Sequence, residues 1–87
     1  MPSEFKFAIL TPGETVYEGM IRSLVAPGME GSFGVWANHA PLLARSSGGR
    51  LTIEEISKTK RVFEVGAGVT EVFENRVIFL TQSARAV

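Results

Sequence analysis

The chain has 87 residues, with nine lysines and arginines against nine aspartates and glutamates, so its formal net charge at pH 7 is zero. A chain of this length forms one domain, assigned to residues 1–87, and its neutrality excludes a global electrostatic attraction to nucleic acid or anionic membranes. The absence of cysteine excludes a disulfide framework and a thiolate zinc site.

The N-terminal third predicts a β-hairpin followed by a broken strand. Residues 5–10 alternate with the period of two that is typical of a strand. Pro12-Gly13 favours a type II turn, in which the glycine takes a positive φ. Residues 15–26 predict two strand segments separated at Gly19, where we expect a bulge, and Pro27-Gly28 ends the second.

The C-terminal half predicts further short strands joined by turns. These strands are expected at residues 40–45, 51–56, 62–65, 69–73 and 76–80. Ser46 to Gly49 forms a flexible turn, and Glu74-Asn75 fits a two-residue hairpin because asparagine tolerates left-handed geometry. The apolar run Val77 to Leu80 is typical of a strand buried on both faces.

No window shows the 3.6-residue repeat of an amphipathic helix, and strand-favouring residues dominate. Many short strands joined by glycine and proline turns predict an all-β sandwich or barrel. No segment approaches the ~20 apolar residues of a membrane helix, and the start lacks the order of a signal peptide. We therefore expect a protein on the cytosolic side that meets a membrane only through a partner.

The stretch from Pro27 to Leu43 differs in composition from the rest of the chain. It holds the only tryptophan, the only histidine and three glycines, Gly28, Gly31 and Gly34. Such a segment predicts a shaped connection on a sheet scaffold, where recognition residues usually lie. The glycine spacing does not predict a phosphate-binding loop, because no following helix and no Gly-Lys-Ser/Thr motif accompanies it.

Four large apolar residues in this stretch carry the main functional hypothesis: Met29, Phe33, Val35 and Trp36. In a glycine-rich connection they cannot all turn inward, and clustered exposed apolar residues indicate a protein contact. The alternative is that Phe33 and Val35 form a short inward strand while Trp36 plugs one end of the sandwich.

The residues give no indication of a catalytic, metal or cofactor site. His39 has no histidine or cysteine partner and no marked nucleophile, so it is interpreted as structural or interfacial. Glu54 and Glu55 lie on opposite faces of a strand, which argues against a carboxylate pair. The alternative function is a small β-barrel that binds single-stranded nucleic acid or a small ligand, using Lys58 to Arg61 beside Phe63.

Several motifs together resemble one family. Glu30-Gly31-Ser32-Phe33-Gly34-Val35, followed by His39-Ala40-Pro41-Leu42-Leu43, closely resembles the signature of the epsilon subunit of rotary F-type ATP synthases, called delta in mitochondria. Residues 9–19 resemble the opening strands of that family, and residues 63–80 resemble its closing strands.

The resemblance implies an N-terminal β-sandwich of about ten short, mostly antiparallel strands. It also implies a non-catalytic rotor subunit of the central stalk that links the gamma subunit to the c-ring and couples proton or sodium flow to ATP synthesis. By position, the c-ring contact is implied at Met29, Glu30, Gly31, Ser32, Phe33 and Val35. The gamma contact is implied at His39, Ala40, Pro41, Leu42 and Leu43.

The resemblance further implies a peripheral location on the cytoplasmic face of the bacterial inner membrane, with no cofactor and no nucleic-acid partner. Two positions depart from the family pattern. Ser32 stands where relatives often carry an acidic residue, and Ala37-Asn38 replaces a Pro-Gly turn that Asn38 can still form. The family continues into a regulatory helical hairpin, but this sequence stops at Val87, so hairpin-based inhibition is not expected.

Overall fold

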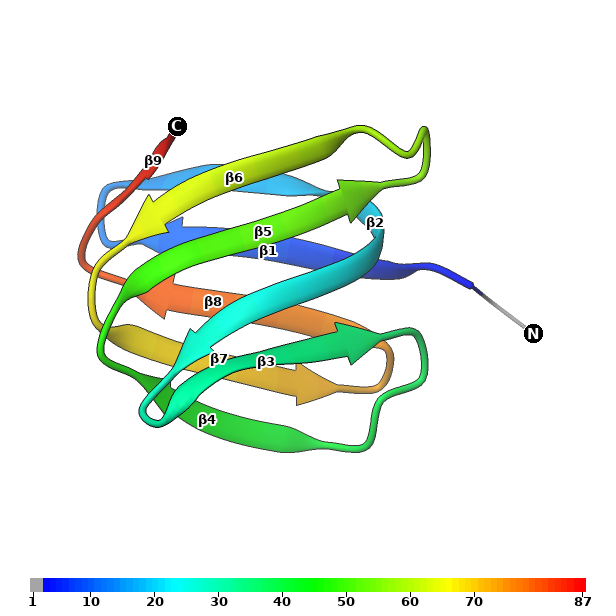
Figure 1. The fold of residues 1–87 in the computed structure, drawn as a ribbon, viewed down its shortest axis with the longest axis horizontal. Helices are drawn as coiled ribbons and strands as arrows, with labels where there is room; N and C mark the ends of the chain where they lie inside the picture. The colour runs from blue at the N-terminus through cyan, green and yellow to red at the C-terminus, as the bar shows by residue number, and fades with distance from the viewer. Residues whose placement is uncertain (1–2) are drawn as a thin grey trace.

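The computed structural model describes residues 3–87, which form nine β-strands and no helix (Figure 1). In chain order the strands are β1 (Phe5–Thr11), β2 (Glu14–Gly28), β3 (Gly31–Trp36), β4 (Leu42–Ser46), β5 (Gly49–Glu55), β6 (Lys60–Val65), β7 (Gly68–Phe73), β8 (Arg76–Thr81) and β9 (Ala84–Ala86). All paired strands are antiparallel except β1 and β8, which run parallel. The predicted all-β class with mostly antiparallel strands is confirmed.

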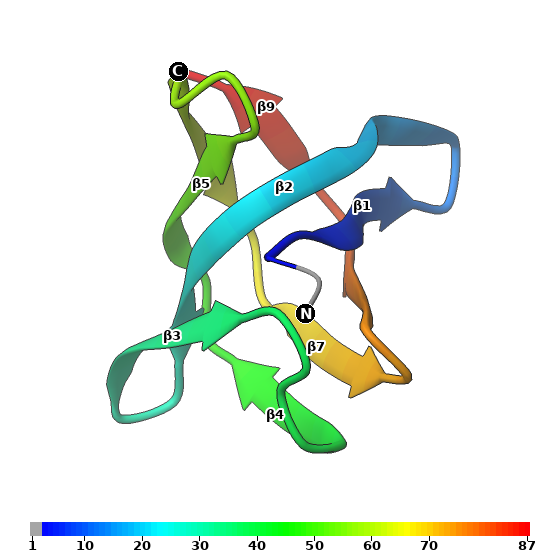
Figure 2. The ribbon, with the colours of Figure 1, turned by 90° about the vertical axis from the view of Figure 1, so that its right-hand side faces the viewer.

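The strands form two packed layers that share β2. The hydrogen-bonded order is β4-β7-β8-β1-β2-β5-β6-β9, and β3 pairs with β2 outside this path. The first half of β2 pairs with β1, whereas its second half lies between β3 and β5. One layer therefore contains β4, β7, β8, β1 and the start of β2, and the other contains β3, the end of β2, β5, β6 and β9 (Figures 1 and 2).

The glycine break predicted in β2 is wrong, because β2 continues through Gly19. The register instead shifts at two other places, opposite Ile9 and Leu10 of β1 and between Ile21 and Ser23 against β5. Gly19 leaves space for the Tyr17 side chain, because a Cβ at position 19 would lie 3.1 Å from the phenol oxygen of Tyr17. Bulges bend strands and increase their twist, which lets one strand serve two layers.

The type II turn predicted at Pro12-Gly13 is also wrong. A two-residue turn does join β1 to β2, with Thr11 paired to Glu14, but Gly13 is not among the residues with positive φ. A turn without positive φ favours splayed strands, and the register shift opposite Ile9 and Leu10 lies close to this turn. The hairpin predicted at Glu74-Asn75 is confirmed, and both residues have positive φ, 50° and 60°.

The shaped connection predicted for residues 27–43 is wrong in its first half. β2 extends through Gly28, and residues 31–36 form β3, so this part is a hairpin with a two-residue loop at Met29 and Glu30. Gly31 has a φ of 127°, which a residue with a side chain rarely adopts. The turn at Asn38 forms as expected, with a φ of 63°.

The core lies between the two layers and takes alternate residues of most strands. Its largest fully buried side chains are Phe5, Phe7, Phe79, Ile9, Ile21, Leu24, Leu51 and Ile53. Full burial of each such side chain contributes roughly 1.5–3 kcal/mol. The prediction that β8 is buried on both faces is wrong, since Val77 and Phe79 point into the core while Leu80 is 45% exposed.

One buried polar atom lacks a partner, which yields a stability prediction. The Thr70 hydroxyl is fully buried and makes no hydrogen bond. Replacing it with a methyl group removes a desolvated donor, so Thr70→Val is expected to raise the free energy of unfolding by about 1 kcal/mol in urea titrations.

The matched control is Thr81→Val. The buried Thr81 hydroxyl donates to the Ala67 carbonyl at 2.9 Å, so its loss is expected to lower the free energy of unfolding by about 1 kcal/mol. Equal destabilisation by the two substitutions would contradict the assignment of Thr70 as an unsatisfied group.

Candidate functional site

The end of the β2–β3 hairpin projects from the sandwich as an exposed tip. We define the hairpin tip as residues 29–32, all of which are exposed, and Met29 is exposed to 61%. The exposed Met29 side chain is a flexible thioether, which can adapt its shape to irregular gaps in a partner surface. Four of the six residues expected at the c-ring contact therefore lie on accessible surface.

The other two expected c-ring residues face inward. Val35 is fully buried, and Phe33 is partly buried against the core, where its ring lies 3.3 Å from the position of a Cβ on Gly28. The interpretation of Phe33 and Val35 as a short inward strand is confirmed, and neither side chain forms part of the exposed tip. The idea that Trp36 plugs one end of the sandwich is wrong, because Trp36 is 61% exposed.

Trp36 is exposed but held in place. Its indole lies flat over Gly34, where a Cβ would come within 2.6 Å of two ring carbons. Gly34 thus leaves the space that the six-membered ring occupies. The result is a large apolar side chain presented on the outside of β3, with its six-membered ring over Gly34.

The expected gamma contact is a short loop leading into β4. The His39 ring nitrogen Nδ1 lies 2.7 Å from the Ala40 carbonyl, and Ala40 and Pro41 are exposed. Leu42 packs against the core, whereas Leu43 on the opposite face is 71% exposed. Within this segment, Leu43 is therefore the apolar side chain available to a partner.

A second part of the chain anchors this loop. The Asn75 side chain accepts a hydrogen bond from the Asn38 backbone N–H at 2.7 Å and donates one to the Glu4 carbonyl at 3.0 Å. One side chain of the β7–β8 hairpin therefore joins the turn before His39 to the start of β1. Sequence reasoning did not find this role of Asn75, and nothing in its local pattern indicates it.

A polar cluster ties the two layers together at Tyr17. The Tyr17 ring packs against Phe7 and Phe63, with centroid distances of 6.1 and 5.6 Å. Its hydroxyl donates to the Glu55 carboxylate at 2.8 Å, and that carboxylate pairs with Arg61 at 3.1 Å. Burial and the Glu55 hydrogen bond raise the pKa of Tyr17 from 10.0 to about 12.

This cluster contradicts the stacking site that the nucleic-acid hypothesis places at Phe63. Phe63, the proposed stacking residue, is only 2% exposed and belongs to the core. Arg61 is committed to Glu55 and lies 6.0 Å from the centre of the Tyr17 ring. The basic corner therefore retains exposed lysines without an accessible aromatic ring, and base stacking requires such a ring.

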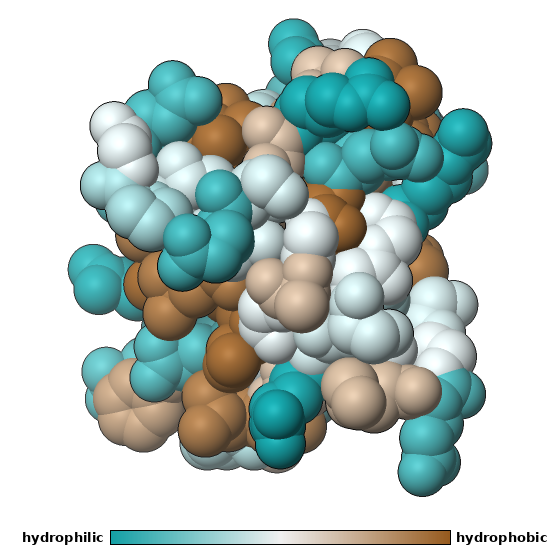
Figure 3. Space-filling model, turned by 90° about the vertical axis from the view of Figure 1, so that its left-hand side faces the viewer, coloured by the Kyte–Doolittle hydropathy of each residue, from teal (hydrophilic) through white to brown (hydrophobic). Residues whose placement is uncertain are grey.

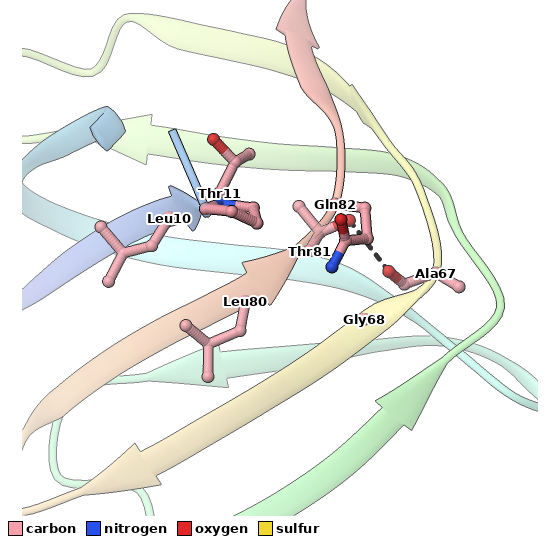
Figure 4. Close-up of a pocket in the computed structure, with 8 residues that line it drawn as sticks. Leu10, Thr11, Ala67, Gly68, Leu80, Thr81 and Gln82 are labelled. Atoms are coloured by element: carbon pink, nitrogen blue, oxygen red, sulfur yellow. Dashed lines mark hydrogen bonds between the residues drawn. The ribbon is translucent and has the colours of Figure 1, made fainter. Parts of the chain in front are cut away.

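The outer face of the β1 layer shows what the sequence prediction missed. At the end of the sandwich seen in Figure 3, apolar surface gathers on the side of the β1 layer. A hollow of about 470 Å³ lies where β1 and β8 end and β7 begins, lined by Leu10, Leu80, Gly68 and their neighbours (Figure 4). No charged side chain lines it. The unbroken apolar run of β8 is the sequence signal for this surface, because Leu80 within it is exposed.

Within residues 3–87 no group of three or more histidine, cysteine, aspartate or glutamate side chains is placed to hold a metal ion. The same residues contain no helix long and apolar enough to cross a membrane. The accessible features include an exposed hairpin tip, a surface tryptophan and exposed apolar side chains on the outer side of the β1 layer. These features define a β-sandwich of the protein-interaction class.

Comparison with known proteins identifies the family within this class. The family model described as the β-sandwich domain of the ATP synthase delta/epsilon chain matches residues 4–87. The chain belongs to this family. It is 36% identical over 78 residues to the ATP synthase epsilon chain of Chlorobium limicola, covering 90% of this chain and 89% of that protein.

A second relative is longer than this chain. The epsilon chain of Sulfurimonas denitrificans is 39% identical over 85 residues, and the match covers 98% of this chain but 65% of that protein.

Two solved structures share the fold. A chain in the Euglena gracilis mitochondrial ATP synthase superposes with a TM-score of 0.91 at 19% identity, covering 99% of this chain and 55% of that one. A chain in the Tetrahymena thermophila mitochondrial ATP synthase gives a TM-score of 0.74 at 17% identity, covering 92% of this chain and 64% of that one.

The raised pKa of Tyr17 makes the fold sensitive to alkaline pH. The unfolded phenol loses its proton near its ordinary pKa of 10.0, while the folded phenol keeps it to about 12. The stability that the neutral phenol provides is therefore fully present below pH 10 and is lost as the pH rises toward 12. In urea titrations, the stability advantage of the wild type over Tyr17→Phe should shrink across this range, and a constant difference would contradict the assignment.

The packing of Trp36 on Gly34 can be tested by fluorescence. Gly34→Ala places a methyl group within 2.6 Å of the indole, so the ring must move outward at a cost of about 0.5–1.5 kcal/mol. Because Trp36 is the only tryptophan, its emission maximum should shift to longer wavelength. Gly13→Ala, where nothing lies within 4 Å, should leave the emission unchanged. An unshifted spectrum for both variants would argue against the stacked arrangement.

Proposed function

We propose that this chain is a non-catalytic rotor subunit in the central stalk of an F-type ATP synthase, joining the gamma subunit to the c-ring. Membership of the delta/epsilon family over residues 4–87 is the observation that carries the proposal. The solved structures that share the fold support it, because one is an OSCP/F1/c-ring complex and the other a central stalk with c-ring. In this role, residues 1–87 act as one domain that passes torque between its partners.

The shape of the domain supports a linking role. The exposed hairpin tip and the exposed side chain of Leu43 on β4 belong to opposite layers of one sandwich. A rigid core between two contacts transmits force without deforming, since packed interiors have low compressibility. By this link the chain couples proton or sodium flow to ATP synthesis, while the reaction itself takes place in other subunits of such a complex.

We assign the c-ring contact to the hairpin tip and the gamma contact to the segment His39–Leu43. The tip combines one long apolar side chain, Met29, with Glu30 and Ser32, a mixture that suits the polar loops of a membrane ring. Membrane association then occurs only through the complex, at the cytoplasmic face of a bacterial inner membrane.

Substitution of Met29 tests the assignment. Tagged chain expressed in cells is purified from detergent-solubilised membranes, and the gamma and c subunits that accompany it are quantified. Met29→Asp should lower c-ring retention at least about tenfold. The reason is that a charged side chain would replace an apolar one at a tip that loses its water when the c-ring binds. Met29 is preferred to Phe33, whose partial burial would confuse loss of folding with loss of binding.

The matched control is Ile56→Asp in the β5–β6 turn, where Ile56 is 47% exposed. It should retain both subunits at the wild-type level, and circular dichroism should be the same for all three proteins. If the wild-type chain brings down neither gamma nor c, the proposed function is wrong. If Met29→Asp retains the c-ring, the assignment of the tip is wrong.

A further inference from the structure

The segment that joins β3 to β4, residues 37–41, is held by few hydrogen bonds. Within residues 3–87, no backbone-to-backbone hydrogen bond involves it. The His39 ring lies 2.7 Å from the Ala40 carbonyl, which belongs to the same segment. The Asn38 N–H donates to the side-chain oxygen of Asn75 at 2.7 Å. In the described part of the chain, this bond alone connects the segment to another element through a hydrogen bond.

Packing holds the two ends of the segment but not its middle. Ala37 and Leu42 lie against the core, whereas Asn38, Ala40 and Pro41 are exposed. The backbone of Asn38 is left-handed, with a φ of 63°. Asparagine tolerates this conformation, but a residue with a side chain keeps it only where the surrounding structure supports it. The contact with Asn75 is the support that the structure provides.

Asn75 is fixed to the sheet on its other side. It lies in the β7–β8 turn, its side-chain amide donates to the Glu4 carbonyl at 3.0 Å, and its own carbonyl accepts from the Lys6 N–H at 3.4 Å. A carbonyl on one side and an N–H on the other determine which way the amide points. The start of β1 thus sets the position of the oxygen that receives the Asn38 N–H.

Asparagine meets each requirement of this position. The turn needs a left-handed backbone, since the φ of Asn75 is 60°, together with one donor and one acceptor. Glycine adopts the same backbone without a side chain, and aspartate keeps the acceptor but has no N–H donor. These two residue types therefore separate the bond to Asn38 from the bond to Glu4.

We infer that Asn75 is a positioning residue for the gamma contact. By holding Asn38, it sets the course of the segment His39–Leu43 before gamma binds. This inference rests on the proposed function, which assigns that segment to gamma. A loop already held in its bound conformation loses less entropy on binding, so the affinity depends on the Asn75 side chain even though Asn75 acts through Asn38.

The c-ring contact provides an internal comparison because it lies elsewhere. Figure 1 shows the β7–β8 turn, the start of β1 and the loop after β3 at one end of the sandwich, and the β2–β3 hairpin at the other. β3 runs from Gly31 at the hairpin tip to Trp36 beside the segment. Loss of the Asn75 side chain is therefore expected to change gamma binding without changing c-ring binding.

The test compares the wild-type chain of 87 residues with Asn75→Gly and Asn75→Asp. Each chain is titrated with purified gamma subunit and, separately, with c-ring in detergent. Asn75→Gly should weaken gamma binding about fivefold, as expected for one lost hydrogen bond, and leave c-ring binding within about twofold. Asn75→Asp keeps the acceptor for the Asn38 N–H, so its gamma affinity should lie within about twofold of the wild type.

Amide exchange reports the hydrogen bond directly. The Asn38 backbone amide should exchange with solvent faster in Asn75→Gly than in the wild type, and Asn75→Asp should restore the slower exchange. The matched control is Lys58→Gly, because Lys58 also has a positive φ, 72°, in the β5–β6 turn. This control should leave the Asn38 exchange and both affinities within about twofold of the wild type.

The outcomes separate this inference from the proposed function. If the wild-type chain binds neither gamma nor the c-ring, both fail. If Asn75→Gly binds gamma as well as the wild type does, or if it loses gamma and c-ring binding together, Asn75 does not position the gamma contact. If Asn75→Asp restores the slow exchange of Asn38 but not the gamma affinity, the bond to Asn38 is not the cause. In these last cases the rotor role remains and the inference is overturned.

Discussion

The architecture depends on β2, a strand of 15 residues that belongs to both layers. Its first half pairs with β1, and its second half lies between β3 and β5, so the two sheets are joined through one continuous strand. A regular strand cannot turn from one layer into the other, and the two register shifts provide the bend. The Tyr17 ring, packed against Phe7 of β1 and Phe63 of β6, then holds the layers at a fixed separation.

This construction explains how a small domain can present two distinct surfaces. The far end of β2 continues into the hairpin tip, while its near end pairs with β1. Force applied to either surface reaches the other through backbone hydrogen bonds and a packed core instead of through a linker. A sandwich of this kind therefore suits a subunit that connects two larger neighbours.

Glycine serves packing here more than it serves flexibility. Tyr17 lies over Gly19, Phe33 beside Gly28 and Trp36 over Gly34, in each case where a methyl group would meet the ring. The aromatic side chain covers the gap in the sheet that the missing side chain leaves, and it gains a fixed position in return.

The sequence alone determined the strand periodicity, most turns and the family, because alternation and turn residues act between near neighbours in the chain. Phe5, Phe7 and Ile9 of β1 and the Glu74-Asn75 hairpin were predictable for this reason. Tertiary structure alone decided which apolar residues are buried. Val35 and Leu80 are both large apolar residues in strands, yet Val35 is fully buried and Leu80 is 45% exposed. Burial depends on which strands lie above a residue, and that arrangement is set by pairings such as β1 with β8, about 70 residues apart in the chain.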